Sequence, residues 1–295
     1  MNNKEVIIVG AGPAGLATAL QLERYGIRSL IIEQGRVGGL LLNANLVENY
    51  PGFPGGIAGP ELVDLFKEQV KSYNLHIYKA RLENLDYTNE QFEFSVDGQL
   101  LHSRLAVVAS GTKPRTLNEL DIPPEIQNKV YYEVYPLLDV VGKQIAIVGA
   151  GDAAFDYALN LARNNDIFVF NRGDKISSLP LLSKRAQLIP RIHYHQETAI
   201  TRTTAGPDER ISLECNTPTG SSGYIVDYLI GAIGREPNLD FASGQFSEKA
   251  IQLENSGKLY YVGDVANGLF RQTGIAVGDG ILAAMKIYKY LKENE

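Results

Sequence analysis

Apolar residues fill the run at residues 6–9, and the glycine-spaced turn Gly10-Ala11-Gly12-Pro13-Ala14-Gly15 follows at once. The pattern then favours a helix over residues 13–25, and a second apolar run at residues 29–32 ends on Glu33. A strand, a glycine turn, a helix and a strand ending on an acid are typical of a dinucleotide-binding unit. This order predicts such a unit at the start of the chain.

Each residue of this motif has a physical role in the expected site. Gly10 permits the tight turn, Gly12 lets the backbone approach a pyrophosphate, and Gly15 lets the helix and strand pack closely. The N-terminus of the helix presents free N–H groups and partial positive charge to the phosphates. The carboxylate of Glu33 is placed to accept hydrogen bonds from an adenosine ribose.

Further elements are predicted between this motif and a glycine-containing segment at residues 110–115. A helix beginning at Gly59-Pro60 has apolar residues at helical spacing on one face: Leu62, Leu65, Phe66, Val70 and Tyr73. Short strands are predicted over residues 81–109, with a hairpin turn at Asp97-Gly98. We expect the chain to leave its first domain at residues 110–115.

The first motif recurs near the middle of the chain. An apolar run at residues 145–148 precedes Gly149-Ala150-Gly151-Asp152-Ala153-Ala154. Aligning Gly10 with Gly149 pairs Gly12 with Gly151, and helix residues beyond the turn also match. This internal duplication predicts two similar nucleotide-binding domains.

The last part of the chain completes the first domain in our interpretation. A strand at residues 259–262 delivers Asp264 at its carboxyl end, and a Gly/Ala-rich helix follows from about residue 275 to 291. Its predicted buried stripe is Ile281, Met285, Tyr288 and Leu291. The predicted fold class is α/β, with two Rossmann-like, three-layer ββα domains, the second inserted into the first. The first domain spans residues 1–112 and 236–295, and the second spans residues 113–235.

Composition fits this two-domain organisation. The chain has 295 residues, of which 44% are hydrophobic and 21% charged, enough for two buried cores. The net charge is -6 and basic residues are scattered, so we expect neither nucleic acid nor membrane partners. No apolar stretch approaches the roughly 20 residues of a membrane span, and the first strand leaves no room for a signal peptide. We therefore expect a cytoplasmic protein.

These motifs together resemble the low-molecular-weight thioredoxin reductases over nearly the whole chain. That family comprises flavoproteins that depend on FAD and a pyridine nucleotide and have two Rossmann-like domains. Besides the two glycine turns and Glu33, the matching segments are Gly38-Gly39-Leu40, residues 47–54, Ala109-Ser110-Gly111, Gly263-Asp264 and Arg271-Gln272. The resemblance implies FAD as cofactor, NAD(P)H as a further ligand, and a homodimer.

The resemblance also implies roles for individual residues. Glu33 would bind the FAD ribose, Asn49 would approach the isoalloxazine ring, and Asp264 would lie near the ribityl and pyrophosphate groups. The last helix would direct its positive end at the flavin pyrimidine. The candidate FAD-binding residues are Gly10, Gly12, Pro13, Ala14, Gly15, Glu33, Gln34, Gly38, Gly39, Leu40, Asn49, Ala109, Gly111, Asp264, Arg271, Gln272 and Thr273.

One departure from the family changes the expected chemistry. Members carry a Cys-x-x-Cys before the second glycine strand, but these positions are Tyr132 and Tyr135 here. The only cysteine, Cys215, lies far along the chain in a predicted strand and is expected to be a small buried hydrophobe. Without a dithiol, electrons cannot pass from flavin to a thioredoxin disulfide by the family route. The tyrosines either stack near the flavin or fill space left by the cysteines.

A second departure concerns the pyridine nucleotide. The His-Arg-Arg segment that gives the family its NADPH specificity is Asn171-Arg172-Gly173 here, so only Arg172 remains to meet a 2′-phosphate. NADPH and NADH both stay open, as does a second domain that has lost nucleotide binding. The candidate residues for the second nucleotide are Gly149, Gly151, Asp152, Ala153, Ala154 and Arg172.

The resulting prediction is an FAD-dependent oxidoreductase that takes hydride from NAD(P)H and reduces a non-disulfide acceptor directly. The acceptor is dioxygen, a small molecule or a small redox protein. The alternatives are a ferredoxin/flavodoxin–NAD(P)+ reductase and an FAD-binding sensor or assembly protein with little turnover. No side chain is assigned as catalytic, because the flavin carries the chemistry. His193 and His195 lack further ligand partners, so no metal site is expected.

Overall fold

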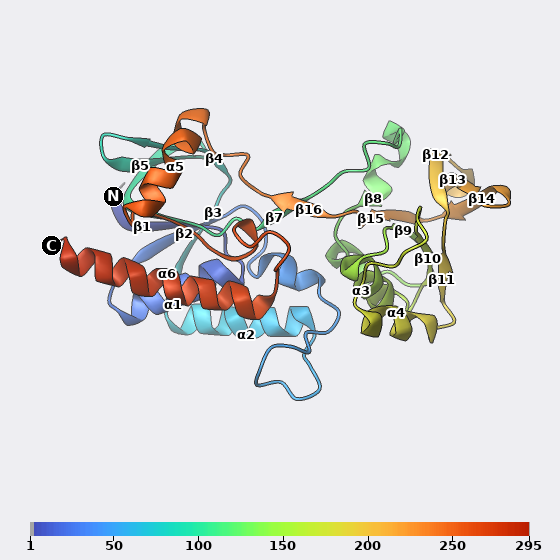
Figure 1. The fold of residues 1–295 in the computed structure, drawn as a ribbon, viewed down its shortest axis with the longest axis horizontal. Helices are drawn as coiled ribbons and strands as arrows, with labels where there is room; N and C mark the ends of the chain where they lie inside the picture. The colour runs from blue at the N-terminus through green and yellow to red at the C-terminus, as the bar shows by residue number, and fades with distance from the viewer. Residues whose placement is uncertain (1–2, 295) are drawn as a thin grey trace. The chain divides into compact units, whose positions relative to one another are not determined.

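The computed structural model describes residues 3–294, and the chain divides into two compact units. Unit 1 comprises Met1–Leu42, Val47–Lys113 and Glu236–Glu295, and unit 2 comprises Asn43–Leu46 and Pro114–Arg235. The two connecting segments, β7 (Thr112–Pro114) and β16 (Arg235–Pro237), pair as a two-stranded sheet (Figure 1). Unit 2 is therefore inserted into unit 1.

Unit 1 is built on a parallel sheet with the strand order β3-β2-β1-β6-β17. Val9 pairs with Ile32 on one side and with Val108 on the other, so the carboxyl ends of the three central strands align. The glycine turn therefore follows β1 at the sheet edge where ligands of α/β folds bind. The strands are β1 (Asn3–Val9), β2 (Ser29–Glu33), β3 (His76–Lys79), β6 (Gln99–Val108) and β17 (Leu259–Tyr261).

An antiparallel meander covers one face of this sheet. It consists of β4 (Leu82–Thr88), β5 (Gln91–Val96) and the first half of β6. Asp97 and Gly98 have φ of 48° and 72°, which confirms the predicted hairpin turn. The helix α5 (Gly244–Asn255) begins after Ser243, whose Oγ accepts the Phe246 N–H at 2.9 Å. Phe246 then packs with the meander's Phe92 and Phe94 in one buried cluster.

Three helices form the layer on the other face: α1 (Pro13–Arg24), α2 (Gly59–Ser72) and α6 (Thr273–Glu293). Figure 1 shows α1 and α6 side by side. They meet at Gly280, where an added Cβ would lie 2.3 Å from the Ala14 carbonyl oxygen. Glycine is therefore required at position 280, and small residues predominate on the buried side of α6, which also includes two larger ones: Ala276, Gly280, Ala283, Ala284, Ile287 and Leu291.

This packing corrects part of the predicted buried stripes. Ile281 and Met285 of α6 are 38% and 50% exposed, because the larger apolar side chains lie away from the close contact with α1. In α2, Leu65 and Tyr73 are also exposed, whereas Leu62 and its neighbour Val63 are buried. Both helices therefore carry apolar residues on exposed faces as well as on the buried face, so helical spacing alone did not identify the buried residues.

Unit 2 repeats the arrangement of unit 1. Its parallel sheet has the order β11-β10-β9-β15-β8, and a meander of β12, β13 and β14 leads into β15. The helices are α3 (Asp152–Leu161) and α4 (Pro180–Gln187). The strands are β8 (Val130–Tyr131), β9 (Gln144–Val148), β10 (Asp166–Phe170), β11 (Ile192–His195), β12 (Ala199–Ala205), β13 (Ile211–Thr217), β14 (Gly220–Val226) and β15 (Tyr228–Gly231).

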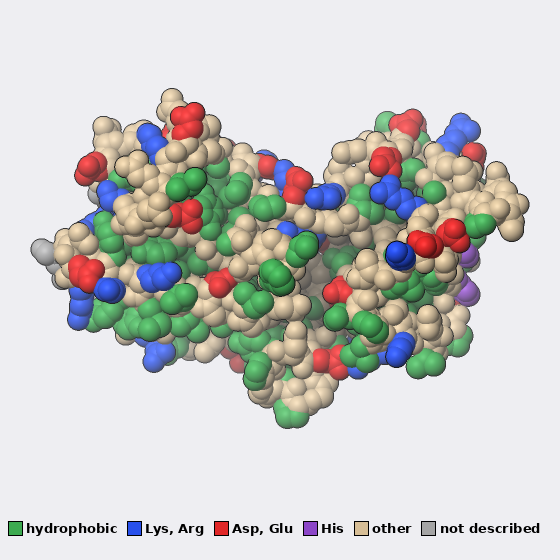
Figure 2. Space-filling model, in the orientation of Figure 1, with side chains coloured by type: hydrophobic (Ala, Val, Ile, Leu, Met, Phe, Trp, Pro, Cys, Tyr) green, Lys and Arg blue, Asp and Glu red, His purple; other side chains and the backbone are tan. Residues whose placement is uncertain are grey.

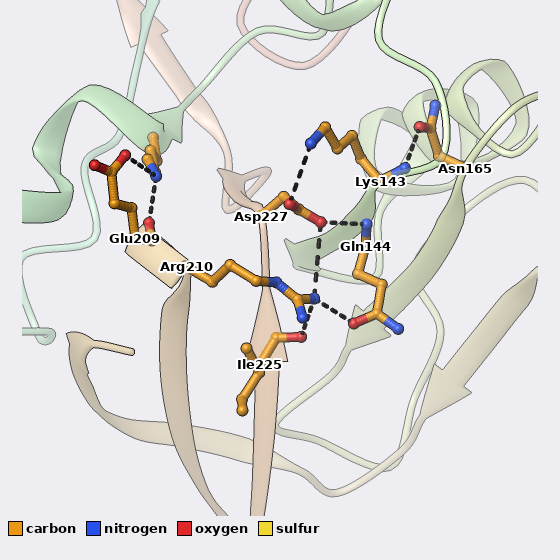
Figure 3. Close-up of polar contacts among 8 residues, drawn as sticks. Lys143, Gln144, Asn165, Glu209, Arg210, Ile225 and Asp227 are labelled. Carbon is orange, nitrogen blue, oxygen red and sulfur yellow. Dashed lines mark hydrogen bonds and ion pairs between the residues drawn. The ribbon is translucent and has the colours of Figure 1, made fainter. Parts of the chain in front are cut away.

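A polar cluster marks the point where the unit 2 meander becomes the parallel sheet (Figure 3). The Asp227 carboxylate accepts a hydrogen bond from the Gln144 N–H at 2.8 Å and lies 3.5 Å from Lys143 Nζ. Arg210 lies 3.7 Å from the same carboxylate and donates to the Ile225 carbonyl at 3.0 Å. These contacts connect the end of the meander to the start of β9, so the cluster has a structural role in unit 2.

The surface carries charges of both signs. Basic and acidic side chains are interspersed on the face drawn in Figure 2. Between residues 3 and 294, no helix is long and apolar enough to cross a membrane.

Replacing Gly280 with alanine should destabilise the protein by about 1–3 kcal/mol, because the added methyl overpacks the contact between α1 and α6. Gly278 of the same helix is the matched control, since a Cβ there meets nothing within 4 Å. Gly278→Ala should stabilise the helix by up to about 1 kcal/mol. Urea unfolding measures both changes, and equal effects of the two substitutions would contradict the close contact.

His195 lies in an aromatic cluster of unit 2. Its ring centroid is 5.1 Å from that of Phe170 and 5.0 Å from that of Tyr224, and Nδ1 contacts the Tyr224 hydroxyl at 3.3 Å. Nε2 is buried without a hydrogen-bond partner. Burial, and secondarily the neighbouring His193, lower the pKa of His195. The folded protein therefore favours the neutral ring.

This burial predicts acid sensitivity. Because the pKa of His195 is lower in the folded than in the unfolded chain, the unfolded state binds more protons below about pH 6.5, and stability falls as pH decreases. His195→Phe should reduce this loss strongly, whereas the control substitution His193→Gln, at an exposed position, should leave most of it in place, because burial is the larger cause. Unfolding free energies at several pH values measure the slope. An unchanged slope in His195→Phe would refute this explanation.

Candidate nucleotide-binding sites

Contacts within the protein require glycine at Gly10 and Gly15 of the first turn, but not at Gly12. Gly10 has φ of 107°, and a Cβ there would lie 2.3 Å from the Ala109 carbonyl oxygen. A Cβ on Gly15 would lie 2.0 Å from the Gly10 carbonyl oxygen. Gly12, in contrast, has extended backbone and open space around its missing Cβ. That space lies at the N-terminus of α1, where a pyrophosphate fits.

The carboxylate of Glu33 closes this turn from the end of β2. One oxygen accepts the Ala11 N–H at 2.7 Å, and the other accepts the Gly35 N–H. A carboxylate has about four acceptor positions, so ribose hydroxyls can still be bound. Gln34 follows at the surface. Glu33 therefore both holds the turn and remains able to bind a ribose.

The loop after β2 returns to the same turn. Gly38 donates its N–H to the Ala11 carbonyl at 2.8 Å and has φ of 98°. A Cβ on Gly38 would lie 2.5 Å from both Val63 methyl groups, so glycine is required there. Gly39 and Leu40 then begin a short 3-10 helix, Gly39–Asn43. The loop therefore places this segment beside the glycine turn.

The structure brings together two predicted residues that are 223 positions apart. Asn49 Nδ2 donates a hydrogen bond to Gln272 Oε1 at 2.8 Å. Arg271 and Thr273 flank Gln272 at the start of α6. These segments were each predicted to approach the flavin ring, and they form one cluster in unit 1.

Asp264 is held close to the first glycine turn. It lies in the short 3-10 helix Gly263–Val265, and a Cβ on Gly263 would come within 2.8 Å of Ala14 Cβ. Asp279 of α6 accepts the Gly263 N–H at 3.1 Å and also binds the Asn267 side chain. Sequence reasoning missed Asp279, although an acid between two glycines of an apolar helix was a signal.

The strand-end residues Ala109 and Gly111 complete the predicted set in unit 1. Ala109 is buried and donates its N–H to the Val9 carbonyl at 2.8 Å. Gly111 has φ of 65°, and its carbonyl accepts the Asn238 N–H at 3.1 Å. Both residues lie where β6 leaves the sheet beside the glycine turn.

The second turn reproduces the geometry of the first. Gly149 has φ of 137°, and a Cβ there would lie 2.3 Å from the Ala232 carbonyl oxygen. The nearest atom to a Cβ on Gly151 is Ser177 Oγ at 3.7 Å, so space for a pyrophosphate remains. Ala154 is buried where the first turn has Gly15. Asp152 accepts the Leu179 N–H at 2.6 Å, and Ala153 is exposed.

Arg172 lies at the surface beside the second turn. Its guanidinium is 3.0 Å from a carboxylate oxygen of Glu119. The preceding residue, Asn171, is buried and binds the loop with its side chain. Sequence reasoning found Arg172 but missed Glu119, because these residues are 53 positions apart and no local pattern joins them.

The two tyrosines at the former cysteine positions have different surroundings. The Tyr132 ring packs on Gly231, where an added Cβ would lie 2.7 Å from it, and its hydroxyl accepts the Leu117 N–H at 3.1 Å. The Tyr135 N–H donates to Asn43 Oδ1 at 2.9 Å. Tyr132 therefore fills space within unit 2.

Cys215 cannot replace a dithiol. It is 1% exposed on β13, and burial raises the pKa of its thiol to about 11. The thiol is therefore protonated at neutral pH and is a poor nucleophile. Within residues 3–294, no group of three or more metal-ligating side chains is assembled.

Comparison with known proteins agrees with this geometry. The pyridine nucleotide-disulphide oxidoreductase family matches residues 4–280. Thioredoxin reductase of Pneumocystis carinii is 28% identical over 324 residues, covering 99% of this chain and 97% of that protein. The crystal structure of Lactococcus lactis thioredoxin reductase matches with a TM-score of 0.85 and 26% identity, covering 98% and 99% of the two chains. Bacillithiol disulfide reductase of Staphylococcus aureus shares the fold, with a TM-score of 0.76 and 20% identity over both full chains.

The family match includes both glycine turns and the segment with Asp264 and Gln272. It confirms the resemblance inferred from the motifs and the fold class of two Rossmann-like domains. The open space at Gly12 and Gly151 fits the two nucleotides that the family uses. The chain therefore belongs to the pyridine nucleotide-disulphide oxidoreductase family, as an FAD-dependent NAD(P)H oxidoreductase of the thioredoxin reductase type.

Proposed function

We propose that this protein takes hydride from NAD(P)H and passes electrons from its flavin directly to an acceptor that is not a disulfide. The observation that carries this proposal is the absence of a dithiol from the sequence. Tyr132 and Tyr135 occupy the cysteine positions, and the one thiol, Cys215, is buried. A dithiol relay to thioredoxin has no residues to carry it.

Unit 1 is the proposed FAD-binding domain. Gly12 and the N-terminus of α1 would bind the pyrophosphate, and Glu33 would bind the adenosine ribose. Asn49 and Gln272 would lie at the flavin edge, with Asp264 toward the ribityl chain. When bound, FAD supplies a ring that accepts hydride and releases electrons. The side chains named here bind and orient that group.

Unit 2 is the proposed NAD(P)H-binding domain. Gly149, Gly151 and the N-terminus of α3 would bind the pyrophosphate. Arg172 is exposed and would meet a 2′-phosphate if the nucleotide carries one. The Asp152 carboxylate accepts the Leu179 N–H and so joins the start of α3 to the segment before α4.

The proposed acceptors are dioxygen, a quinone-like small molecule, or a redox protein such as ferredoxin or flavodoxin. Interspersed charges on the face in Figure 2 offer no broad basic patch there for an acidic partner. The net charge of -6 also disfavours an acidic partner, so we favour a small acceptor over an acidic redox protein. The alternative is a reductase that passes its electrons to a carrier protein. Reoxidation rates of the reduced flavin with each acceptor distinguish the two.

We also propose that two copies associate through unit 1, as the family resemblance implies. The exposed apolar side chains on α6 support this proposal: Ile281, Leu282 and Met285. Sedimentation equilibrium distinguishes a dimer from the 32.4 kDa monomer.

The proposed function predicts that NADH or NADPH bleaches the flavin absorption under anaerobic conditions. The reduced protein should then be reoxidised by dioxygen, a quinone or a redox protein, but not by thioredoxin disulfide, because no dithiol is present. Stopped-flow spectroscopy with each acceptor measures the rates. The control is a dithiol-containing thioredoxin reductase. Failure of both nucleotides to reduce the flavin would refute the enzyme proposal, and rapid thioredoxin reduction would refute the acceptor class.

The two glycine turns provide a matched test of the site assignments. Gly12→Ala should lower FAD affinity at least about tenfold and leave NAD(P)H affinity unchanged, since the added methyl occupies the pyrophosphate space. Gly151→Ala should do the reverse. Neither Cβ meets a protein atom within 3.4 Å, so both variants should fold. Flavin content and nucleotide titration measure the two affinities, and loss of FAD from Gly151→Ala would contradict the assignment.

A further inference from the structure

The loops that follow β2 and β10 are equivalent in their backbone contacts. Gly10 donates its N–H to the Ile32 carbonyl at 2.8 Å, and Gly149 donates to the Phe170 carbonyl at 3.0 Å. The residue after the acceptor is Glu33 in unit 1, so its counterpart in unit 2 is Asn171. Both side chains also accept an N–H from the residue two positions later. Asn171 therefore occupies the ribose-binding position of unit 2.

Asn171 has its hydrogen-bonding groups committed inside the protein. Its Oδ1 accepts the Gly173 N–H at 3.1 Å, and its Nδ2 donates to the Lys175 carbonyl at 3.0 Å and to the Tyr194 hydroxyl at 2.9 Å. The residue is 8% exposed. It carries no charge to repel a 2′-phosphate. Discrimination between nucleotides must therefore come from neighbouring residues.

Arg172 is the adjacent cation, and Glu119 already contacts it. The two side chains are 77% and 84% exposed, with nitrogen and oxygen 3.0 Å apart. Such an exposed pair is weak, because solvent screens both charges, so a phosphate can displace the carboxylate from the guanidinium. The negative charge of Glu119 nevertheless remains nearby and opposes a second anion.

The backbone on both sides of Glu119 is anchored. Leu117 is buried and donates its N–H to the Tyr132 hydroxyl at 3.1 Å. Leu120 donates its N–H to the Leu117 carbonyl at 3.0 Å and packs on the same core cluster. The turn therefore keeps Glu119 beside Arg172, and Tyr132 is one of its supports.

We propose that Glu119 is a specificity-determining residue that weakens binding of the 2′-phosphate at Arg172, so that this protein does not prefer NADPH over NADH. The inference rests on the proposed binding of NAD(P)H in unit 2. It assigns the two charges opposite roles: Arg172 attracts a 2′-phosphate, and Glu119 reduces that attraction. Removing the Glu119 charge shifts the preference toward NADPH.

Isothermal titration calorimetry of the FAD-loaded protein tests this with adenosine 2′,5′-bisphosphate and 5′-AMP as ligands. Glu119→Gln should raise the affinity for the bisphosphate about three- to tenfold and leave that for 5′-AMP unchanged. The gain should shrink as salt is added. Arg172→Gln should lower the affinity for the bisphosphate in both backgrounds and leave that for 5′-AMP unchanged. For flavin reduction, the KM for NADPH relative to that for NADH should be lowest in Glu119→Gln, intermediate in the wild type and highest in Arg172→Gln.

Glu214→Gln is the matched control, because it removes an equal charge from an exposed ion pair of unit 2, that with Arg202. It should leave both affinities unchanged. An unaltered bisphosphate affinity in Glu119→Gln, with normal 5′-AMP binding, would overturn the role of Glu119 alone. If the wild-type protein binds neither ligand, the nucleotide-binding proposal for unit 2 fails, and this inference fails with it.

Discussion

The close approach of α6 to α1 at Gly280 is the contact on which the organisation of unit 1 depends. Because the Ala14 carbonyl lies where a Cβ of residue 280 would be, the last helix can rest directly on the first. The segments before α6 are thereby carried to the first glycine turn. Gly263 packs on Ala14, and Gln272 meets Asn49. One backbone contact thus joins the two ends of the chain into a single site.

The glycine turns of the two units have the same backbone hydrogen bonds, and the two units differ in the side chains beside the turns. The turn-closing hydrogen bonds of Gly10 and Gly149 differ by only 0.2 Å in length. At the next position, Glu33 keeps acceptor capacity toward a ligand, whereas Asn171 is bound within its loop. Duplication therefore preserved the backbone of the turn, which depends on glycine, and left the residue at the end of the second strand of each unit free to change.

Local sequence patterns predicted the elements whose cause is local. The glycine turns, the Asp97-Gly98 hairpin and the central strands follow from conformational freedom and apolar runs. The orientation of α6 did not follow, because its apolar residues cover several faces and only contact with α1 selects one. Glu119 escaped prediction for a related reason, since its partner lies 53 positions away. Contacts between distant segments are set by packing, which no local pattern encodes.

The tyrosine pair at the former dithiol positions also limits how many electrons each chain stores. A dithiol beside a flavin would let a protein hold a second pair of electrons after the first hydride arrives. Here Tyr132 is fixed against Gly231 and Leu117, and Cys215 is isolated in the core. The flavin is left as the sole store, with a capacity of one hydride equivalent. Each turnover must therefore empty the flavin before the next nucleotide can react, which ties the consumption of NAD(P)H directly to the supply of acceptor.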